Sequence, residues 1–278
     1  MTKKKLFALI DGDGLIHGAK WRNKKDTIEK GWITLGEACK NYDRAVNECI
    51  QKTYATEVAI AVKGPNNYRD VLYDDYKKSK SRAQNRDNDV AWIGKLKDYA
   101  ANRPDTVVCD GYEADDLLRI WACEIREREL TEDVTYVVCT GDKDLDCIWG
   151  KHYQFRRTGM EPKLYNVTEE HSQLFFWEQV LTGDKIDNIP GLPGVAHKTA
   201  MRLLGAEYEK GAKGKIIVEP TNSVEERERI VVKTYVEKFG LEEGFSNFLM
   251  NCKLLYMWKT YGGHFTYKKE RFIGLAGA

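Results

Sequence analysis

The stretch LFALIDGDG (residues 6–14) joins five apolar residues to an acidic, glycine-rich turn. An apolar run of this length fits a buried parallel strand. Two further runs, TVVC (106–109) and TYVVCT (135–140), also precede acidic residues. Because the ligand crevice of an open α/β sheet lies outside the carboxyl ends of its strands, we expect these acidic residues to meet there. The sequence therefore predicts an α/β fold with an acidic site at one edge of the sheet.

Eight acidic side chains occur in four clusters along the chain. They are Asp11; Glu113, Asp115 and Asp116; Asp142 and Asp144; and Asp184 and Asp187, the last two spaced for one face of a helix. So many carboxylates can share one site only if cations neutralise them. Hard oxygen ligands with few histidines favour Mg²⁺ or Mn²⁺ over zinc, and a double set of carboxylates predicts two ions. Each cluster alone also fits a turn or a helix cap, so the prediction rests on their conjunction.

Composition and charge exclude several classes of protein. The chain has 278 residues, a formal net charge of +1 and seven scattered cysteines, an odd number that predicts reduced thiols in a cytosol. The basic start is followed by only five apolar residues, which we interpret as a strand and not as a targeting segment. No apolar stretch approaches the roughly 20 residues that span a bilayer, so we expect a soluble, cytoplasmic protein without membrane partners.

The hydrophobic pattern alternates between strands and helices. We expect strands at 57–62, 106–109 and 134–139, a hairpin within 153–165, a loop at 210–218, and helices after the capping residue Thr34, at 90–102, at 113–129, after Thr168, from Ser223 to about Gly240 and from there through Trp258. This alternation predicts a parallel sheet with helices on both faces.

A basic run follows the second expected strand. The segment YKKSKSRAQNR (76–86) contains no acidic residue and carries Lys77, Lys78, Lys80, Arg82 and Arg86. Most charge runs are simply solvated. This one brings an aromatic residue, Tyr76, that could stack on a base, and a basic rim beside an acidic, metal-filled pit suits a phosphodiester.

A glycine- and proline-rich turn, IPGLPGVAHKTA (189–200), separates two helical patterns. Gly191 and Gly194 would let the backbone approach a polyanion, and the N–H groups that open the next helix, from Val195 onward, would point at it. His197 and Lys198 could add phosphate contacts. Without its neighbours, the turn fits a plain helix connector equally well.

The motifs follow one another in an order that resembles a known family. The chain reads IDGDG (10–14), YR (68–69), YK (76–77), GYEADD (111–116), TGDKDLD (140–146) and GDKIDNIPGLPGVAHKTA (183–200). In this order the motifs are similar to those of the 5′-nuclease (flap endonuclease) superfamily, and most similar to those of the small standalone bacteriophage 5′→3′ exonucleases. The resemblance implies a PIN-like α/β core at 1–167 with a basic arch at about 63–89. It also implies a helical DNA-binding region at 168–278, with a helix-three-turn-helix at about 180–206 that grips duplex phosphates with the help of K⁺.

The resemblance also implies a role for individual residues. It places Asp11, Glu113, Asp115 and Asp116 in a first metal group, Asp142, Asp144, Asp184 and Asp187 in a second, Lys77 and Arg82 in catalysis, and Arg69, Tyr76, Lys78, Lys80, Arg86, Gly191, Gly194, Val195, His197 and Lys198 at DNA. The chain departs from the pattern at one point. Many members have an aspartate where this chain reads Val62, so a ligand of the first group is missing or is supplied by Asp13.

The function implied is a metal-dependent 5′→3′ exonuclease on double-stranded DNA that uses two Mg²⁺ or Mn²⁺ ions. Flap-endonuclease and RNase H-like, RNA-primer-removing activity belong to the same expectation. The expected partners are DNA with 5′ ends or flaps, RNA/DNA hybrids and replication proteins, in the cytoplasm of an infected bacterial host. Two alternatives stay open. DGDG and GDKDLD also resemble the acidic motifs of haloacid-dehalogenase-type phosphatases, and the acid missing at Val62 fits an inactive DNA-binding protein.

Overall fold

The computed structural model describes residues 4–20, 33–79, 91–155, 161–206, 208–211, 214–217 and 221–277. The chain forms two compact units. The first comprises Met1–Tyr68, Gln84–Thr168 and Met257–Tyr261; the second comprises Arg69–Ala83, Glu169–Tyr256 and Gly262–Ala278. The segment after the second strand thus groups with the helical unit, and a short piece near the C-terminus groups with the α/β unit.

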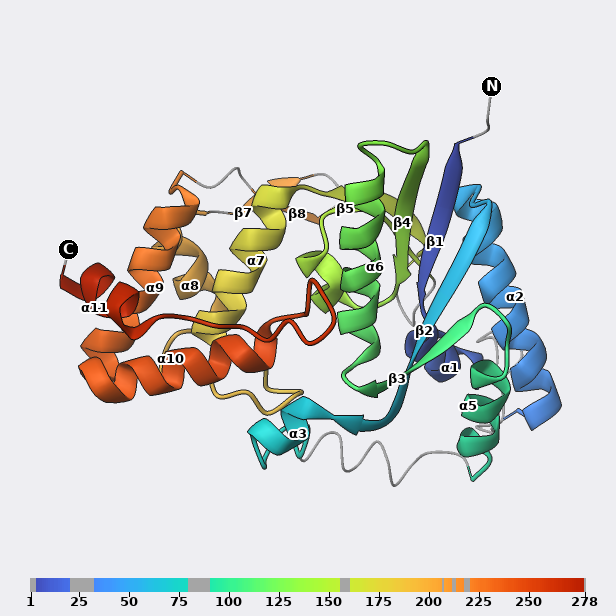
Figure 1. Ribbon diagram of the computed structural model, residues 1–278, viewed down its shortest axis with the longest axis horizontal. Coiled ribbons are helices and arrows are strands. Elements are labelled where there is room, and N and C mark those ends of the chain that lie inside the picture. Colours follow the sequence, from blue (N-terminus) through green and yellow to red (C-terminus); the bar gives the residue numbers. More distant parts are fainter. Residues whose placement is uncertain are drawn as a thin grey trace. The chain divides into compact units, whose positions relative to one another are not determined.

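The first unit is built on a six-stranded sheet in the order β3-β2-β1-β4-β5-β6 (Figure 1). The strands are β1 (Lys5–Asp11), β2 (Glu57–Asn67), β3 (Thr106–Gly111), β4 (Val134–Thr140), β5 (Gly150–Gln154) and β6 (Lys163–Val167). The first five are parallel to their neighbours, and β6 pairs antiparallel with β5. The apolar runs therefore form a mainly parallel sheet, as the sequence predicts.

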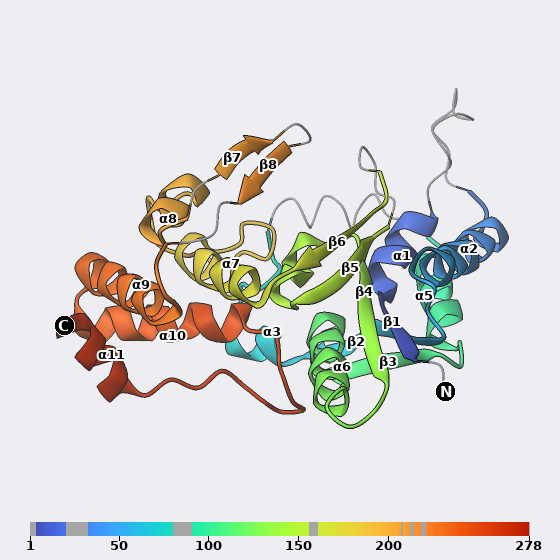
Figure 2. The ribbon, with the colours of Figure 1, turned by 90° about the horizontal axis from the view of Figure 1, so that it is seen from above.

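Helices cover both faces of this sheet. On one face lie α1 (Gly12–Ala19), α2 (Leu35–Thr53) and α5 (Ile93–Ala101); on the other lies α6 (Ala114–Arg128) (Figure 2). The alternation of side chains along a strand explains this arrangement. Ile10 of β1 packs in the core beneath α1, α2 and α5, whereas its neighbour Leu9 lines a hollow with Trp121 of α6. Helix α2 begins with the predicted capping box, in which Thr34 and Glu37 bond to each other's backbone N–H groups.

The second unit is mainly helical. It contains α3 (Tyr68–Leu72), which begins at the last residue of the first unit, α7 (Glu169–Thr182), α8 (His197–Leu203), α9 (Val224–Phe239), α10 (Leu241–Leu255), α11 (Lys269–Gly277) and the antiparallel strands β7 (Tyr208–Gly211) and β8 (Gly214–Ile217). Its core contains Val180, Val231, Phe248 and Phe272, all fully buried. The predicted capping box of Ser223 and Glu226 opens α9.

Two predictions for this unit are wrong. Residues 210–218 do not form a simple loop, because most of them belong to the β7–β8 hairpin. In this hairpin β7 ends at Gly211 and β8 begins at Gly214. The last predicted helix does not reach Trp258. It ends at Leu255, and a further helix, α11, follows, with Phe272 as its buried residue. None of the helices that the structure describes is long and apolar enough to cross a membrane.

Candidate active site

The carboxyl ends of β1 and β4 bring Asp11 and Asp142 to the same place. These strands are neighbours, and the chain runs from β1 toward β3 on one side and from β4 toward β6 on the other. The point where the strand order reverses is where open α/β sheets bind ligands. Thr140 links the two acids: its hydroxyl donates to Asp11 Oδ2 at 3.0 Å and accepts from the N–H of Asp142 at 2.9 Å. The predicted meeting of these two clusters is confirmed within the first unit.

Asp11 is a buried carboxylate with other acids around it. Its side chain caps α1 by accepting from the N–H of Gly14 at 2.9 Å. Burial is the main cause that raises the pKa of Asp11 to about 7, and the negative charges of Asp13 and Asp142 raise it further, against the Gly14 and Thr140 hydrogen bonds. A cation at this position would remove that penalty, so the donor set fits a divalent ion with oxygen ligands.

The GYEADD motif caps α6 with two of its three acids. Glu113 and Asp116 form a reciprocal capping box, in which each side chain bonds to the other's backbone N–H. Asp116 is fully buried, and its second oxygen accepts from the N–H of Trp258 at 3.0 Å. Backbone donors thus hold both oxygens of Asp116 in place at the start of α6, and its role as a metal ligand stays a prediction. Asp115, half-buried in the first turn of α6, stays a candidate ligand.

Asp144 lies in the first turn of η2 (Lys143–Cys147), a short 3-10 helix that follows the end of β4. Its N–H donates to Asp142 Oδ1 at 3.1 Å, and its carboxylate lies 3.6 Å from the ammonium of Lys143. Asp142 and Asp144 are therefore held close together at the exit of β4.

Within β2, just before its pairing with β3 shifts register, the chain carries Lys63 and not an acid. Asp13, in the first turn of α1, accepts from the N–H of Lys63 at 2.9 Å. The ammonium of Lys63 lies 4.0 Å from Glu113 Oε1. Burial raises the pKa of Asp13, while the Lys63 N–H bond and the charges of His17, Lys97 and Lys63 lower it. The carboxylate of Asp13 thus reaches the place where the family pattern has an aspartate.

In the second unit, Asp184 and Asp187 lie in a closed loop and not on a helix. Gly183, with φ +67°, ends α7 in the left-handed conformation. Asp184 Oδ1 then accepts from the N–H groups of Ile186 at 2.6 Å and Asp187 at 3.2 Å, and the backbone of Asp184 pairs with that of Ile189. The prediction of one helical face is wrong, although the two carboxylates are still neighbours.

The beginning of the basic run is tied to this loop. The N–H of Lys77 donates to the carbonyl of Asp187 at 2.8 Å, and the side chain of Asn188 donates to the carbonyl of Asp75 at 2.9 Å. The Lys77 ammonium lies 3.5 Å from Asp187 Oδ2. Lys77 also has φ +55°, which a residue with a side chain adopts at a cost of about 1–3 kcal/mol, and such strain is concentrated at functional sites. The structure therefore brings a predicted catalytic lysine and a predicted metal ligand together.

Two residues assigned to DNA are buried. Tyr76 is 3% exposed, packs in the core of the second unit and turns its hydroxyl toward Asp187 at 3.4 Å, so it cannot stack on a base in this structure. Arg69 is 2% exposed, and its guanidinium donates to the carbonyls of Leu254 and Tyr256 at 2.7 and 2.8 Å. Both side chains hold the segment that leads into the basic run. Lys78 is exposed, whereas Lys80, Arg82 and Arg86 lie outside the described residues.

The two glycines of the turn have different roles. Gly191 is buried at φ +60°, and a Cβ there would come within 2.3 Å of the N atom of Gly183. A glycine at this position therefore lets the two ends of the loop pack against each other. Gly194 is exposed at φ +87° with open space where a Cβ would be. Of these two glycines, only Gly194 leaves room for a polyanion.

The residues after Gly194 lead into α8. The N–H of Val195 already donates to the carbonyl of Leu192 at 3.1 Å, and its side chain packs partly against the core. His197 bonds through Nδ1 to Glu178 at 2.7 Å, and Lys198 is exposed. Of these three predicted DNA contacts, His197 and Lys198 are both exposed, and His197 is in addition held by Glu178.

Thr140 and Lys63 are the site residues that sequence reasoning missed. The signal for Thr140 was a polar residue at the end of an apolar strand, directly before Gly-Asp. Among the described residues, no group of three or more His, Cys, Asp or Glu side chains is arranged so as to hold a metal ion by itself.

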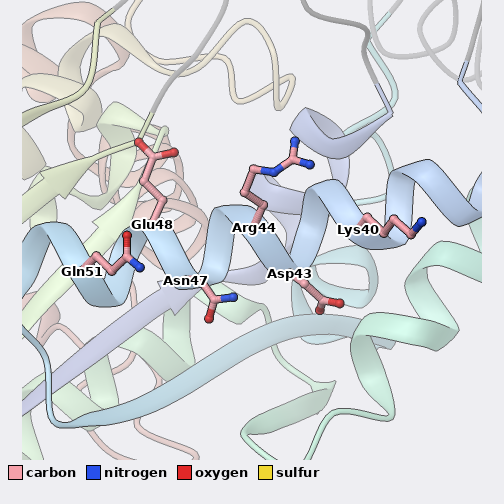
Figure 3. A pocket seen from close by; sticks show the side chains of 6 residues that line it. All are labelled: Lys40, Asp43, Arg44, Asn47, Glu48 and Gln51. Carbon is pink, nitrogen blue, oxygen red and sulfur yellow. The ribbon is translucent and has the colours of Figure 1, made fainter.

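The hollow in Figure 3 lies apart from these acids. It has a volume of about 510 Å³ and runs along α2, where Lys40, Asp43, Arg44, Asn47, Glu48 and Gln51 line it. Glu48 accepts from the hydroxyl of Tyr153 at 2.9 Å, and Asp43 pairs with Arg103 at 2.6 Å. Its polar lining includes none of the predicted site residues, so we assign it no part in the chemistry.

Comparison with known proteins agrees with this arrangement. Residues 6–174 match the family model described as the 5′-3′ exonuclease, N-terminal resolvase-like domain. A DNA polymerase I of Rhizobium leguminosarum is 31% identical over 220 residues, which are 73% of this chain but only 21% of that polymerase. The flap endonuclease Xni of Shewanella sediminis is 25% identical over 71% of this chain and 75% of its own length.

Solved structures support the fold across both units. The D15 flap endonuclease of bacteriophage T5, crystallised with DNA and metal ions, superposes with a TM-score of 0.57 over 99% of this chain and 100% of its own, at 13% identity. The PIN-like α/β fold is thereby confirmed. The comparisons do not support the phosphatase alternative.

Proposed function

Because the chain belongs to the family of the 5′-3′ exonuclease, N-terminal resolvase-like domain, we propose that it hydrolyses double-stranded DNA from the 5′ end with the help of divalent metal ions. The observation that carries this proposal is the pairing of Asp11 with Asp142 through Thr140, at the point where the strand order reverses. Flap cleavage belongs to the same proposal, since a relative that this chain matches over 75% of the relative's length is named a flap endonuclease.

The metal-holding residues of the first unit would be Asp11, Glu113, Asp115, Asp116, Asp142 and Asp144. Two bound Mg²⁺ or Mn²⁺ ions would supply a nucleophilic water and stabilise the leaving oxygen. Asp116 would also keep Glu113 and the start of α6 in place. Thr140 would orient Asp11 and hold the backbone of Asp142 at the same time. Asp184 and Asp187, in the second unit, would be metal ligands as well, by analogy with the family.

Lys77 would stabilise the charge that develops on the scissile phosphate. It is a compact cation, held by its backbone and strained conformation beside a proposed ligand. Arg82 would assist it, again by analogy. Lys78, Lys80 and Arg86 would contact flanking phosphates, and Gly194 with Lys198 would form a clamp that does not depend on sequence. A K⁺ ion at this clamp is part of the proposal.

The wider substrate range rests on analogy alone. We propose that RNA/DNA hybrids are cut as well, which would let the enzyme remove RNA primers, and that it acts beside replication proteins in the cytoplasm of an infected bacterium. The alternative of an inactive DNA-binding protein rests on the missing acid at Val62. The carboxylate of Asp13, however, reaches the backbone N–H of the next residue, Lys63.

One experiment separates these possibilities. A duplex labelled at its 5′ end is incubated with the protein and Mg²⁺, with and without EDTA. Release of short labelled products that EDTA abolishes supports the nuclease. Binding without cleavage would identify an inactive DNA-binding protein, and loss of a terminal phosphate alone would identify a phosphatase.

A further inference from the structure

Lys63 places its ammonium beside an acid of the proposed site in the first unit. Its ammonium lies 4.0 Å from Glu113 Oε1, and the side chain of Glu113 is only 9% exposed. A cation at this distance neutralises part of the charge that a divalent ion would otherwise neutralise. The pairing is notable because Glu113 is one of the proposed ligands.

The position of Lys63 is fixed by its backbone and not by its charge. Its N–H donates to Asp13 Oδ2 at 2.9 Å. The next residue, Gly64, lies so close to β3 that a Cβ there would come within 1.9 Å of the carbonyl oxygen of Cys109. The pairing of β2 with β3 shifts register between Lys63 and Asn67, and such bulges are common beside active sites because they re-aim a side chain. Replacing the Lys63 side chain therefore leaves these contacts intact.

We propose that Lys63 competes with a divalent cation for Glu113 and thereby sets the affinity of the first metal group. The inference rests on the proposed function for its ion. In the absence of an ion, the ammonium compensates Glu113. When an ion binds, the ammonium must move toward solvent, which its 37% exposed side chain permits, and the two cations repel each other.

Calorimetric titration of the metal-free protein with Mn²⁺ tests this proposal. Lys63→Met keeps the length of the side chain and removes its charge, so the dissociation constant should fall on the order of tenfold. Lys63→Arg keeps the charge and should bind Mn²⁺ about as the unaltered protein does. Lys52→Met, the same change at an exposed position on α2, controls for net charge and should have no comparable effect.

Three results would overturn the proposal: unchanged Mn²⁺ affinity in Lys63→Met, equal tightening in Lys52→Met, or equal tightening in Lys63→Arg. Thermal unfolding checks that the variants are folded, and Lys63→Gln replaces the methionine variant if that one is not. The titration needs no DNA. If Lys63→Met binds Mn²⁺ more tightly but the unaltered protein cuts no duplex, the proposed nuclease function is refuted and this inference stands. If the unaltered protein cuts duplex but Lys63→Met binds Mn²⁺ with unchanged affinity, this inference is refuted and the nuclease function stands.

Discussion

Replacing Asp11 with asparagine should stabilise the metal-free protein, and more so at pH 8 than at pH 5. Asp11 is 6% exposed and surrounded by acids, which together with burial raise its pKa from 3.8 to about 7. Asparagine is neutral at both pH values and can still accept from the N–H of Gly14 and meet the hydroxyl of Thr140. The substitution therefore removes a buried charge while it keeps the shape of the site.

The magnitude follows from the raised pKa. Since the folded state holds this proton more tightly than the unfolded state, its stabilising effect is present at low pH and is lost as the pH rises toward 7. One pKa unit corresponds to about 1.4 kcal/mol, so the unaltered protein should lose about 3 kcal/mol of unfolding free energy between pH 5 and pH 8 through this group. The asparagine variant should not show this loss.

Urea unfolding in EDTA, followed by tryptophan fluorescence at both pH values, measures the difference. Asp98→Asn, at an exposed position on α5, serves as the matched control and should leave the two pH values equally affected. If Asp11→Asn changes the unfolding free energy by the same amount at pH 5 and pH 8, the buried, charged state of Asp11 is refuted. Mg²⁺ should raise the stability of the unaltered protein at pH 8 more than that of the variant.

Five further substitutions test the site in other ways. Asp142→Asn or Asp184→Asn should reduce cleavage by at least about 10²-fold while duplex binding is retained, because affinity comes from cationic and backbone contacts; near-normal turnover in both would contradict the ligand assignment. Lys77→Ala should slow single-turnover cleavage on the order of 10²-fold, whereas Lys78→Ala should mainly lower affinity, and equal small effects in both would remove the catalytic role of Lys77. Gly194→Val should weaken binding to any duplex by a similar factor, because a side chain there both blocks phosphate approach and is strained at φ +87°; a titration that shows loss for particular sequences only would contradict the clamp.

Local sequence signals predicted the frame of the site well. The three apolar runs that precede acids became β1, β3 and β4, and the neighbouring positions of β1 and β4 explain why Asp11 and Asp142 meet. The capping box at Thr34 was equally readable, because it depends on residues only three apart.

Other features depend on contacts between distant segments, which a single sequence does not reveal. Asp116 reads as one more acid of a cluster, and nothing in the sequence shows that the N–H of Trp258, 142 positions along the chain, donates to its carboxylate. Val62 reads as a missing ligand, yet the ammonium of the next residue, Lys63, lies beside Glu113. Tyr76 and Arg69 read as members of a basic, DNA-facing segment until the core around them is known.

One local signal in the sequence does indicate the loop that carries Asp184 and Asp187. Gly183 directly follows the apolar end of α7, and a glycine at that position commonly ends a helix in the left-handed conformation. It therefore indicated a loop for Asp184 and Asp187. The β7–β8 hairpin and α11 were not predicted, because both are short. In α11, moreover, Phe272 is the one fully buried residue, so the helix has almost no hydrophobic pattern.

The most direct test of the account is the polarity of cleavage on one duplex labelled at the 5′ end of one strand and at the 3′ end of the same strand. We predict that the 5′ label is released first in short products, that Mg²⁺ is required, and that Asp142→Asn abolishes release while it still shifts the duplex in a gel. Release that begins at the 3′ label, or that continues in EDTA or in the Asp142→Asn variant, would contradict a metal-dependent 5′ nuclease.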